Sequence, residues 1–199
     1  VFRNAFVYSE RRISGIIKPN FSLLKTYQTQ ITYQLEYLVD NNYLQNDDEN
    51  LVHKLSSYCY RSTVNNVNET KKVLKKLSHN FELGLVSNYY GNVNTVLTEL
   101  NLAKYFSAIV DSTIVGIRKP NNKIFEIIFS QLKINAKKAI VVGDSYKNDI
   151  TPSKLLGCTT VWLKVKEWTE TYDLEYADFI ISSIKDLPQA IDYLNEINS

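Results

Sequence analysis

The stretch VVGDSYKNDI, residues 141–150, is an apolar run that leads into a glycine and two spaced carboxylates. Together with the preceding KAI it has the apolar character of a strand that is buried on both faces. Asp144 and Asp149 follow the end of that strand, where burying an unpaired acid is unfavourable. Because ligands of open parallel sheets bind beyond the carboxyl ends of the strands, this loop is a candidate functional site.

Predicted strands and helices alternate from residue 67 to the end of the chain. The strands are expected at 81–88, 107–112, 138–144, 159–165 and 177–183, and the helices at 68–80, 92–106, 121–133, 149–157 and 187–197. Alternation at this spacing favours a parallel sheet with helices on both faces. The sequence therefore predicts an α/β domain over residues 67–199.

Residues 1–66 show helical patterns only. The segment 20–44 repeats apolar residues every three or four positions, and 47–62 opens with acids, which suit the positive end of a helix. Apolar residues of these two segments fall on one side of each helix: Leu24, Tyr27, Ile31, Leu35 and Leu38, and Leu51, Leu55 and Tyr58. This part is expected to form a small helical bundle.

Composition narrows the class of protein and of partner. The 199 residues are 44% hydrophobic and 22% charged, with a net charge of +2, which is a soluble globular balance. Such a charge favours neither nucleic acid nor an anionic membrane as a partner. Cys59 and Cys158 have no metal-type spacing and fit a reduced, cytoplasmic protein. No pattern in the sequence specifies an oligomeric state.

Two more polar clusters accompany predicted strands. Ser87 and Asn88 end the strand at 81–88, and GIRKPNN places Lys119 in a loop ahead of a helix. A serine hydroxyl with nearby backbone N–H groups can bind a phosphoryl oxygen, and lysine supplies a compact positive charge. Asp144 and Asp149 offer the hard oxygen ligands that Mg²⁺ prefers. Together these residues form a clamp suited to phosphoryl transfer.

Each cluster also has a purely structural interpretation. Ser87-Asn88 is compatible with a turn, Lys119 with a solvated loop, and Asp149 with a helix cap. The order and spacing of all three clusters along one chain favour the functional interpretation over these separate ones.

The three clusters resemble motifs of the haloacid dehalogenase superfamily of phosphatases and phosphotransferases. LVSN resembles the second motif, with Ser87 as the phosphate-binding hydroxyl, and RKPNNKIF resembles the third, with Lys119 as its lysine. VVGDSYKND resembles the fourth, with Asp144 as a metal ligand and Asp149 as its supporting acid. The resemblance covers residues 67–199, and the helical segment 1–66 is similar in position and character to the cap of many members.

This resemblance implies a Rossmann-like core at 67–199, a helical cap at 1–66, bound Mg²⁺ and an aspartyl-phosphate intermediate. It implies catalytic roles for Lys119 and Ser87, phosphate binding by Ser87, Asn88 and Lys119, and metal binding by Asp144 and Asp149. The expected activity is Mg²⁺-dependent hydrolysis of a small phosphorylated metabolite. The acid loop favours this phosphatase branch over the metal-independent dehalogenases.

Three alternatives remain from the residues and the resemblance. One is a phosphomutase of the same superfamily. Another is a catalytically inactive relative that binds phosphorylated ligands or has a regulatory role. The third is a receiver-type signalling domain, against which the helical segment ahead of the core and the Gly-Asp-(x)₄-Asp loop both argue. Nothing in the cap sequence identifies the substrate.

The first motif of the superfamily, a strand ending in Asp-x-Asp, has no counterpart in the sequence. VFRNAFVYSERR contains no Asp, and its first acid is Glu10. In this fold the first-motif strand lies between the strands at 81–88 and 138–143. Its loss would leave about ten backbone groups unpaired, at roughly 1–3 kcal/mol each if buried. We therefore expect the native chain to extend further toward its N-terminus, and residues 1–199 alone to show a gap in the sheet.

Overall fold

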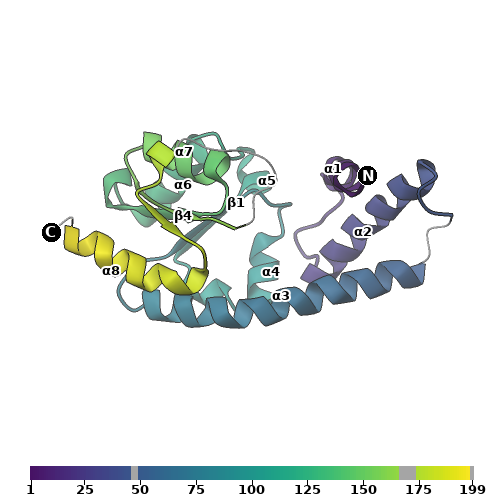
Figure 1. Cartoon of the computed structure of the whole chain (residues 1–199), viewed down its shortest axis with the longest axis horizontal. Coiled ribbons are helices and arrows are strands. Elements are labelled where there is room, and N and C mark those ends of the chain that lie inside the picture. The colour runs from purple at the N-terminus through teal and green to yellow at the C-terminus, as the bar shows by residue number, and fades with distance from the viewer. Residues whose placement is uncertain (46–48, 166–173, 198–199) are drawn as a thin grey trace. The chain divides into compact units, whose positions relative to one another are not determined.

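The chain folds into two compact units in a computed structural model that describes residues 1–45, 49–165 and 174–197. One unit comprises Val1–Asn68 and Tyr89–Ala103, and the other comprises Glu69–Asn88 and Lys104–Ser199. The long helix α3 (Glu49–Leu77) contributes residues to both (Figure 1). This division places 89–103 with the N-terminal unit, and the assignment of 1–66 to a cap and 67–199 to a core stays a prediction. Among the described helices, none has the length and apolar character needed to cross a membrane.

The N-terminal unit is helical, as its sequence pattern predicts. It contains α1 (Phe2–Ile13), α2 (Leu23–Asp40), the first part of α3 and α4 (Val93–Glu99). Ser22 caps α2, because its side chain accepts a hydrogen bond from the Lys25 N–H at 3.1 Å. The three long helices share one apolar cluster, formed by Ala5, Ile31, Leu35 and Leu38 with Leu51, Val52 and Cys59 packed against them.

The prediction of separate helices at 47–62 and 68–80 is wrong, because α3 runs without interruption through both. Its described part contains no glycine or proline, so nothing in the local sequence ends the first helix. Leu51 packs in the N-terminal unit and Leu77 in the other, so each end of α3 gains its own buried contacts. The predicted helix start at 47–48 lies outside the described residues.

The second unit contains the five expected strands, all paired in parallel. They are β1 (Gly84–Ser87), β2 (Ala108–Asp111), β3 (Ile140–Gly143), β4 (Thr159–Leu163) and β5 (Phe179–Ile181). In the register of the sheets Ser87 lies opposite Asp111, and Gly143 lies opposite Trp162. The α/β class and the parallel pairing predicted from sequence are confirmed.

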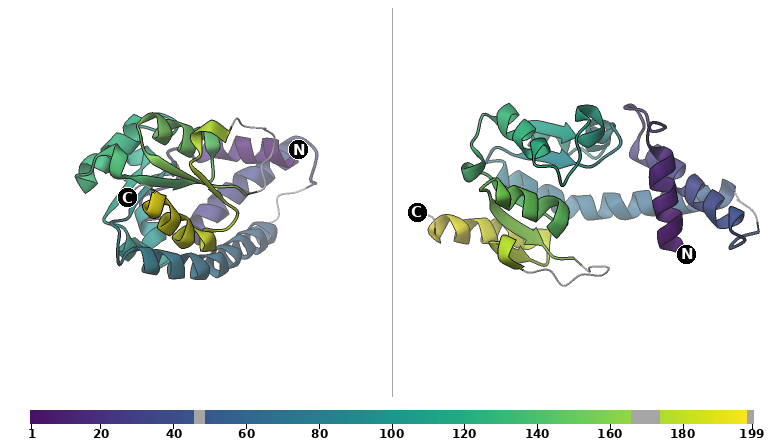
Figure 2. Two further views of the ribbon diagram at one scale, coloured as in Figure 1. Left: turned by 60° about the vertical axis from the view of Figure 1, so that its left-hand side comes forward. Right: turned by 90° about the horizontal axis from the view of Figure 1, so that it is seen from above.

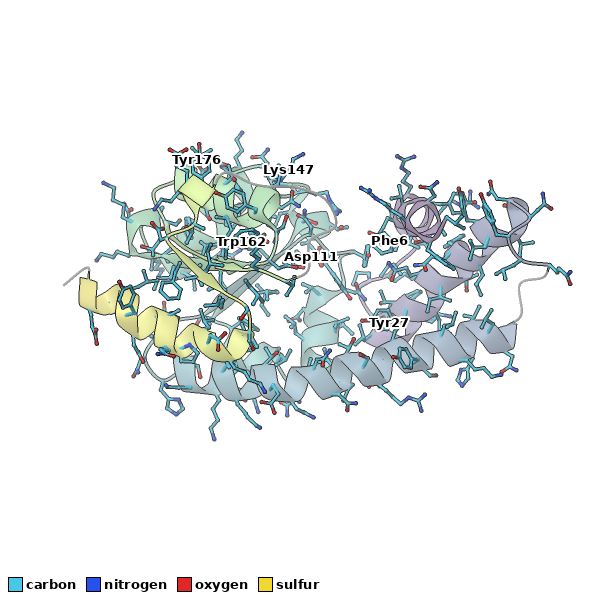
Figure 3. The ribbon with its side chains drawn as sticks, viewed as in Figure 1. Phe6, Tyr27, Asp111, Lys147, Trp162 and Tyr176 are labelled. Carbon is cyan, nitrogen blue, oxygen red and sulfur yellow. The ribbon has the colours of Figure 1, made fainter. Side chains whose placement is uncertain are left out.

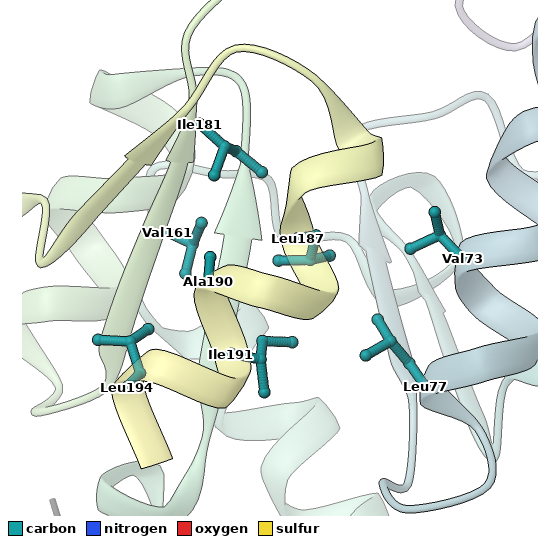
Figure 4. Packing of buried hydrophobic residues seen from close by; sticks show 8 residues of the cluster. All are labelled: Val73, Leu77, Val161, Ile181, Leu187, Ala190, Ile191 and Leu194. Atoms are coloured by element: carbon teal, nitrogen blue, oxygen red, sulfur yellow. The ribbon is translucent and has the colours of Figure 1, made fainter. Parts of the chain in front are cut away.

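Helices cover both faces of these strands. The helix α6 (Lys123–Leu132) packs against one face through Ile124, Phe125, Ile128 and Phe129. The helix α8 (Leu187–Ile197) and the end of α3 pack against the other, through Leu187, Ala190, Ile191 and Leu194 and through Val73 and Leu77 (Figure 4). On β3, Ile140 and Val142 contact the second cluster and Val141 the first, which explains the continuous apolar run of this strand.

The strands form two separate sheets, with orders β1-β2 and β3-β4-β5. Among the described residues no strand pairs with both β1 and β3, so each keeps an unpaired edge (Figure 2). This is the gap expected between the strands at 81–88 and 138–143.

The remaining elements are short. They are α5 (Ser112–Val115), α7 (Thr151–Leu155) and helical turns at Ala103–Tyr105, Ala136–Lys138, Tyr146–Ile150, Leu174–Tyr176 and Ile184–Asp186. The sequence analysis did not anticipate α5, and it expected one continuous helix at 92–106 where α4 ends at Glu99.

Candidate active site

The predicted site residues of the second unit lie at or near the carboxyl ends of its strands. Ser87 is the last residue of β1, Asp144 directly follows β3, and Lys119 lies in the loop between α5 and α6. The Lys119 ammonium is 2.6 Å from Asp149 Oδ1 and 3.2 Å from the carbonyl oxygen of Val86. Lys119 thus joins the ends of β1 and β3, although these strands belong to different sheets.

The Lys119–Asp149 ion pair is largely shielded from water. The exposed fraction of the side chain is 15% for Lys119 and 7% for Asp149. The second carboxylate oxygen of Asp149 accepts a hydrogen bond from the Ser145 N–H at 3.0 Å. Both oxygens of Asp149 therefore have a partner, as a buried carboxylate requires.

Gly143 makes room for this carboxylate. A Cβ atom at position 143 would lie 2.6 Å from Asp149 Cγ, closer than atoms of real side chains approach one another. Only glycine lets the Asp149 side chain lie against the end of β3. The Gly-Asp pair seen in the sequence thus combines a small residue that admits Asp149 with an acid, Asp144, that is exposed.

Asn88 holds the main chain of Lys119. Its side-chain oxygen accepts a hydrogen bond from the Lys119 N–H at 2.8 Å, and its amide nitrogen donates to the Lys119 carbonyl oxygen at 3.0 Å. The carboxamide is therefore already engaged within the protein. The predicted contact of Asn88 with phosphate stays a prediction.

Asp144 is exposed, and its main chain is held in place by Trp162. The indole Nε1 of Trp162 donates to the Asp144 carbonyl oxygen at 3.1 Å. Trp162 is buried, and its ring meets that of Tyr146 edge-on with centroids 5.0 Å apart. Figure 3 shows Trp162 within the unit and Lys147, from the loop that carries the two acids, at its surface. The linear sequence does not single out Trp162, because its position opposite Gly143 follows from sheet register.

Asp111 is a second residue that the sequence analysis missed. It ends β2 opposite Ser87 and is buried, and its Oδ1 accepts a hydrogen bond from the Thr113 N–H at 2.9 Å. This bond caps α5, the short helix that leads into the loop bearing Lys119. The sequence does carry a signal for this role: Asp111 directly follows the apolar run of a strand, and Asp is a preferred N-cap residue at the start of a helix.

The donor set of the site fits Mg²⁺ at Asp144 better than at Asp149. The described residues contain no group of three or more His, Cys, Asp or Glu placed to bind a metal ion. Mg²⁺ is commonly held by one or two carboxylates, with water and phosphate completing its shell. Asp144 is exposed at a strand end and suits that role, whereas Asp149 would have to give up Lys119 or Ser145.

Comparisons with known proteins agree with this architecture. The chain is 27% identical over 181 residues to a glyceraldehyde 3-phosphate phosphatase of Pyrococcus furiosus, which covers 88% of this chain and 75% of that protein. It is 35% identical over 111 residues to a phosphoglycolate phosphatase of Escherichia coli K12, covering 55% of this chain and 44% of that protein.

A solved structure and a family model extend the likeness. The crystal structure of a HAD phosphatase from Thermococcus onnurineus shares the fold, with a TM-score of 0.56, 20% identity and coverage of 96% of this chain and 87% of that one. Residues 17–163 match the model of the haloacid dehalogenase-like hydrolases. The matched span includes Ser87, Lys119, Asp144 and Asp149. The chain therefore belongs to the haloacid dehalogenase-like hydrolase family.

Proposed function

We propose that the complete protein is a Mg²⁺-dependent phosphatase that acts on a small phosphorylated metabolite. The observation that carries this proposal is the position of the Lys119 ammonium. It lies at the end of β1, where it donates to the Val86 carbonyl oxygen, and it pairs with Asp149 in the loop that also bears Asp144. A cation held between a strand that ends in a hydroxyl donor and a loop that carries an exposed acid is suited to a transferring phosphoryl group.

The residues of this chain take distinct roles in the proposal. The Ser87 hydroxyl and the N–H groups that follow β1 donate hydrogen bonds to phosphoryl oxygens. Lys119 offsets their negative charge, and Asp149 keeps the ammonium in place. Asp144 would hold Mg²⁺, which supplies further positive charge to the same oxygens when bound.

The attacking carboxylate in the proposal belongs to the Asp-x-Asp strand expected ahead of Val1. The unpaired edges of β1 and β3 offer the backbone groups that such a strand requires. Its first Asp would attack phosphorus while the substrate oxygen departs with a proton from the second Asp. Water then attacks the aspartyl phosphate, which releases inorganic phosphate and restores the carboxylate.

The substrate class follows from the named relatives. Both are phosphatases of phosphorylated two- or three-carbon compounds, so we place the substrate among small phosphorylated metabolites. The cytoplasmic location expected from the cysteines suits such a substrate.

The test is a phosphate-release assay on the chain extended by its upstream coding sequence. The panel contains glyceraldehyde 3-phosphate, phosphoglycolate and an aryl phosphate, each with Mg²⁺ and with a chelator. We expect Mg²⁺-dependent release that Asp144→Asn abolishes and that Asp192→Asn, a matched change at an exposed site on α8, leaves unchanged. A folded extended protein that hydrolyses none of the panel would refute the proposal. Unaltered Mg²⁺ dependence in Asp144→Asn would refute the metal assignment.

A further inference from the structure

The side chain of Asn88 forms two hydrogen bonds with a single residue 31 positions away. It accepts from the Lys119 N–H at 2.8 Å and donates to the Lys119 carbonyl oxygen at 3.0 Å. We infer that Asn88 is a positioning residue that sets where the Lys119 ammonium lies, an assignment whose catalytic meaning rests on the proposed phosphatase function.

The chemistry of the two bonds restricts which side chain can make them. A carboxamide carries an acceptor oxygen and a donor nitrogen side by side, so it pairs with a main-chain N–H and C=O as a neighbouring strand would. An aspartate could accept from the N–H but could not donate to the carbonyl oxygen. An alanine would leave both main-chain groups of Lys119 without this partner.

The lysine is consequently attached to one strand end at two places. Asn88, directly after β1, holds its main chain, and the Val86 carbonyl of β1 accepts from its ammonium at 3.2 Å. Asp149 holds the ammonium from the side of β3. With the main chain fixed, the flexible stem delivers the charge to the space between the Val86 carbonyl and Asp149. Without Asn88 the main chain of Lys119 would lose both of these hydrogen bonds, and the ammonium contacts alone would connect Lys119 to β1 and Asp149.

The first test reads the exposure of Lys119 and needs no enzymatic activity. The extended protein is acylated briefly with a limiting amine reagent, and the labelling of each lysine is measured by mass spectrometry relative to the exposed Lys138. We expect Asn88→Ala to raise labelling of Lys119 toward that of Lys138, and Asn88→Asp to raise it less. If Lys119 stays as protected in both variants as in the wild type, the inference is wrong.

A matched control separates this effect from a general loss of stability. Asn135 also accepts a main-chain hydrogen bond, from the Lys137 N–H at 3.0 Å, but it caps the turn ahead of β3. Asn135→Ala should leave labelling of Lys119 unchanged. Equal increases in Asn135→Ala and Asn88→Ala would show general loosening and overturn the inference.

The second test asks whether the two residues act as one unit. On a substrate that the extended protein hydrolyses, Asn88→Ala should lower kcat by up to about 10², the loss typical of a misplaced catalytic group, with a smaller change in KM. In a Lys119→Ala background the same change should cost almost nothing more, because the group it positions is gone. The same fold-loss in both backgrounds would contradict positioning through Lys119. If the wild type hydrolyses nothing, the proposed function fails, while the labelling experiment still decides whether Asn88 positions Lys119.

Discussion

Replacing Lys119 by methionine removes the positive charge of the shielded Lys119–Asp149 pair and keeps much of the volume of the lysine side chain. The carboxylate of Asp149, 7% exposed, would then keep only the Ser145 N–H as a described partner. Breaking a buried ion pair by removing one partner costs about 3–5 kcal/mol. Because Lys119 is 15% exposed and water can reach part of the site, we expect the low end, about 3 kcal/mol. At roughly 2–4 °C per kcal/mol for a chain of this size, the melting temperature should fall by about 6–12 °C.

The double variant Lys119→Met with Asp149→Leu separates the charge effect from packing. Two apolar groups leave no uncompensated charge, and such replacements of buried pairs are often close to neutral. The loss of the bond to Ser145 remains, so the double variant should be destabilised by about 1 kcal/mol. It should thus be more stable than Lys119→Met alone.

Urea unfolding of the extended protein measures these differences, with an unchanged m-value as the check that they reflect native stability. Lys72→Met is the matched control, since its ion pair with Glu69 is exposed, at 73% and 42%. Exposed pairs contribute about 0–1 kcal/mol, so this variant should change little. A Lys119→Met variant as stable as Lys72→Met, or a double variant that is the least stable of all, would refute the assignment of a shielded and coupled pair.

Three other predictions concern the second unit and the cysteines. Trp162→Phe keeps a buried ring but removes the donor to the Asp144 carbonyl, so it should cost about 1 kcal/mol in urea unfolding and weaken Mg²⁺ binding; unchanged values would contradict the role given to the indole. Burial alone raises the pKa of Asp178, but its hydrogen-bond donors, an ammonium among them, outweigh this and hold it below its ordinary 3.8. The stabilisation is therefore present above that value and lost as the pH falls through the folded-state pKa. Asp178→Asn should be less stable by about 1 kcal/mol near neutral pH, and the difference in free energy of unfolding should shrink below about pH 4. Burial raises the pKa of the Cys158 thiol to about 11, so a thiol reagent at neutral pH should label the half-buried Cys59 first and Cys158 only as the protein unfolds, as mass spectrometry would show.

Local patterns in the sequence determined where the strands of the second unit lie and which polar residues follow them. The run around Val141 indicates a strand with apolar contacts on both faces, because no polar residue interrupts it, and β3 packs against an apolar cluster on each face. Ser87, Lys119 and Asp144 could be expected at one edge of the fold, because the carboxyl ends of parallel strands face the same way. The length of each strand and the continuity of α3 were less predictable, since element ends depend on packing partners as well as on local residues.

Only the tertiary structure decided which groups meet at that edge. The bonds of Asn88 to the Lys119 main chain, of Trp162 to the Asp144 carbonyl and of Lys119 to Val86 all join residues from different elements. They depend on sheet register and loop geometry, which a linear pattern does not record. The same is true of the separation between β1 and β3: hydrogen bonding between strands is a non-local property, and the apolar run of each strand is the same whether its edge is paired or open.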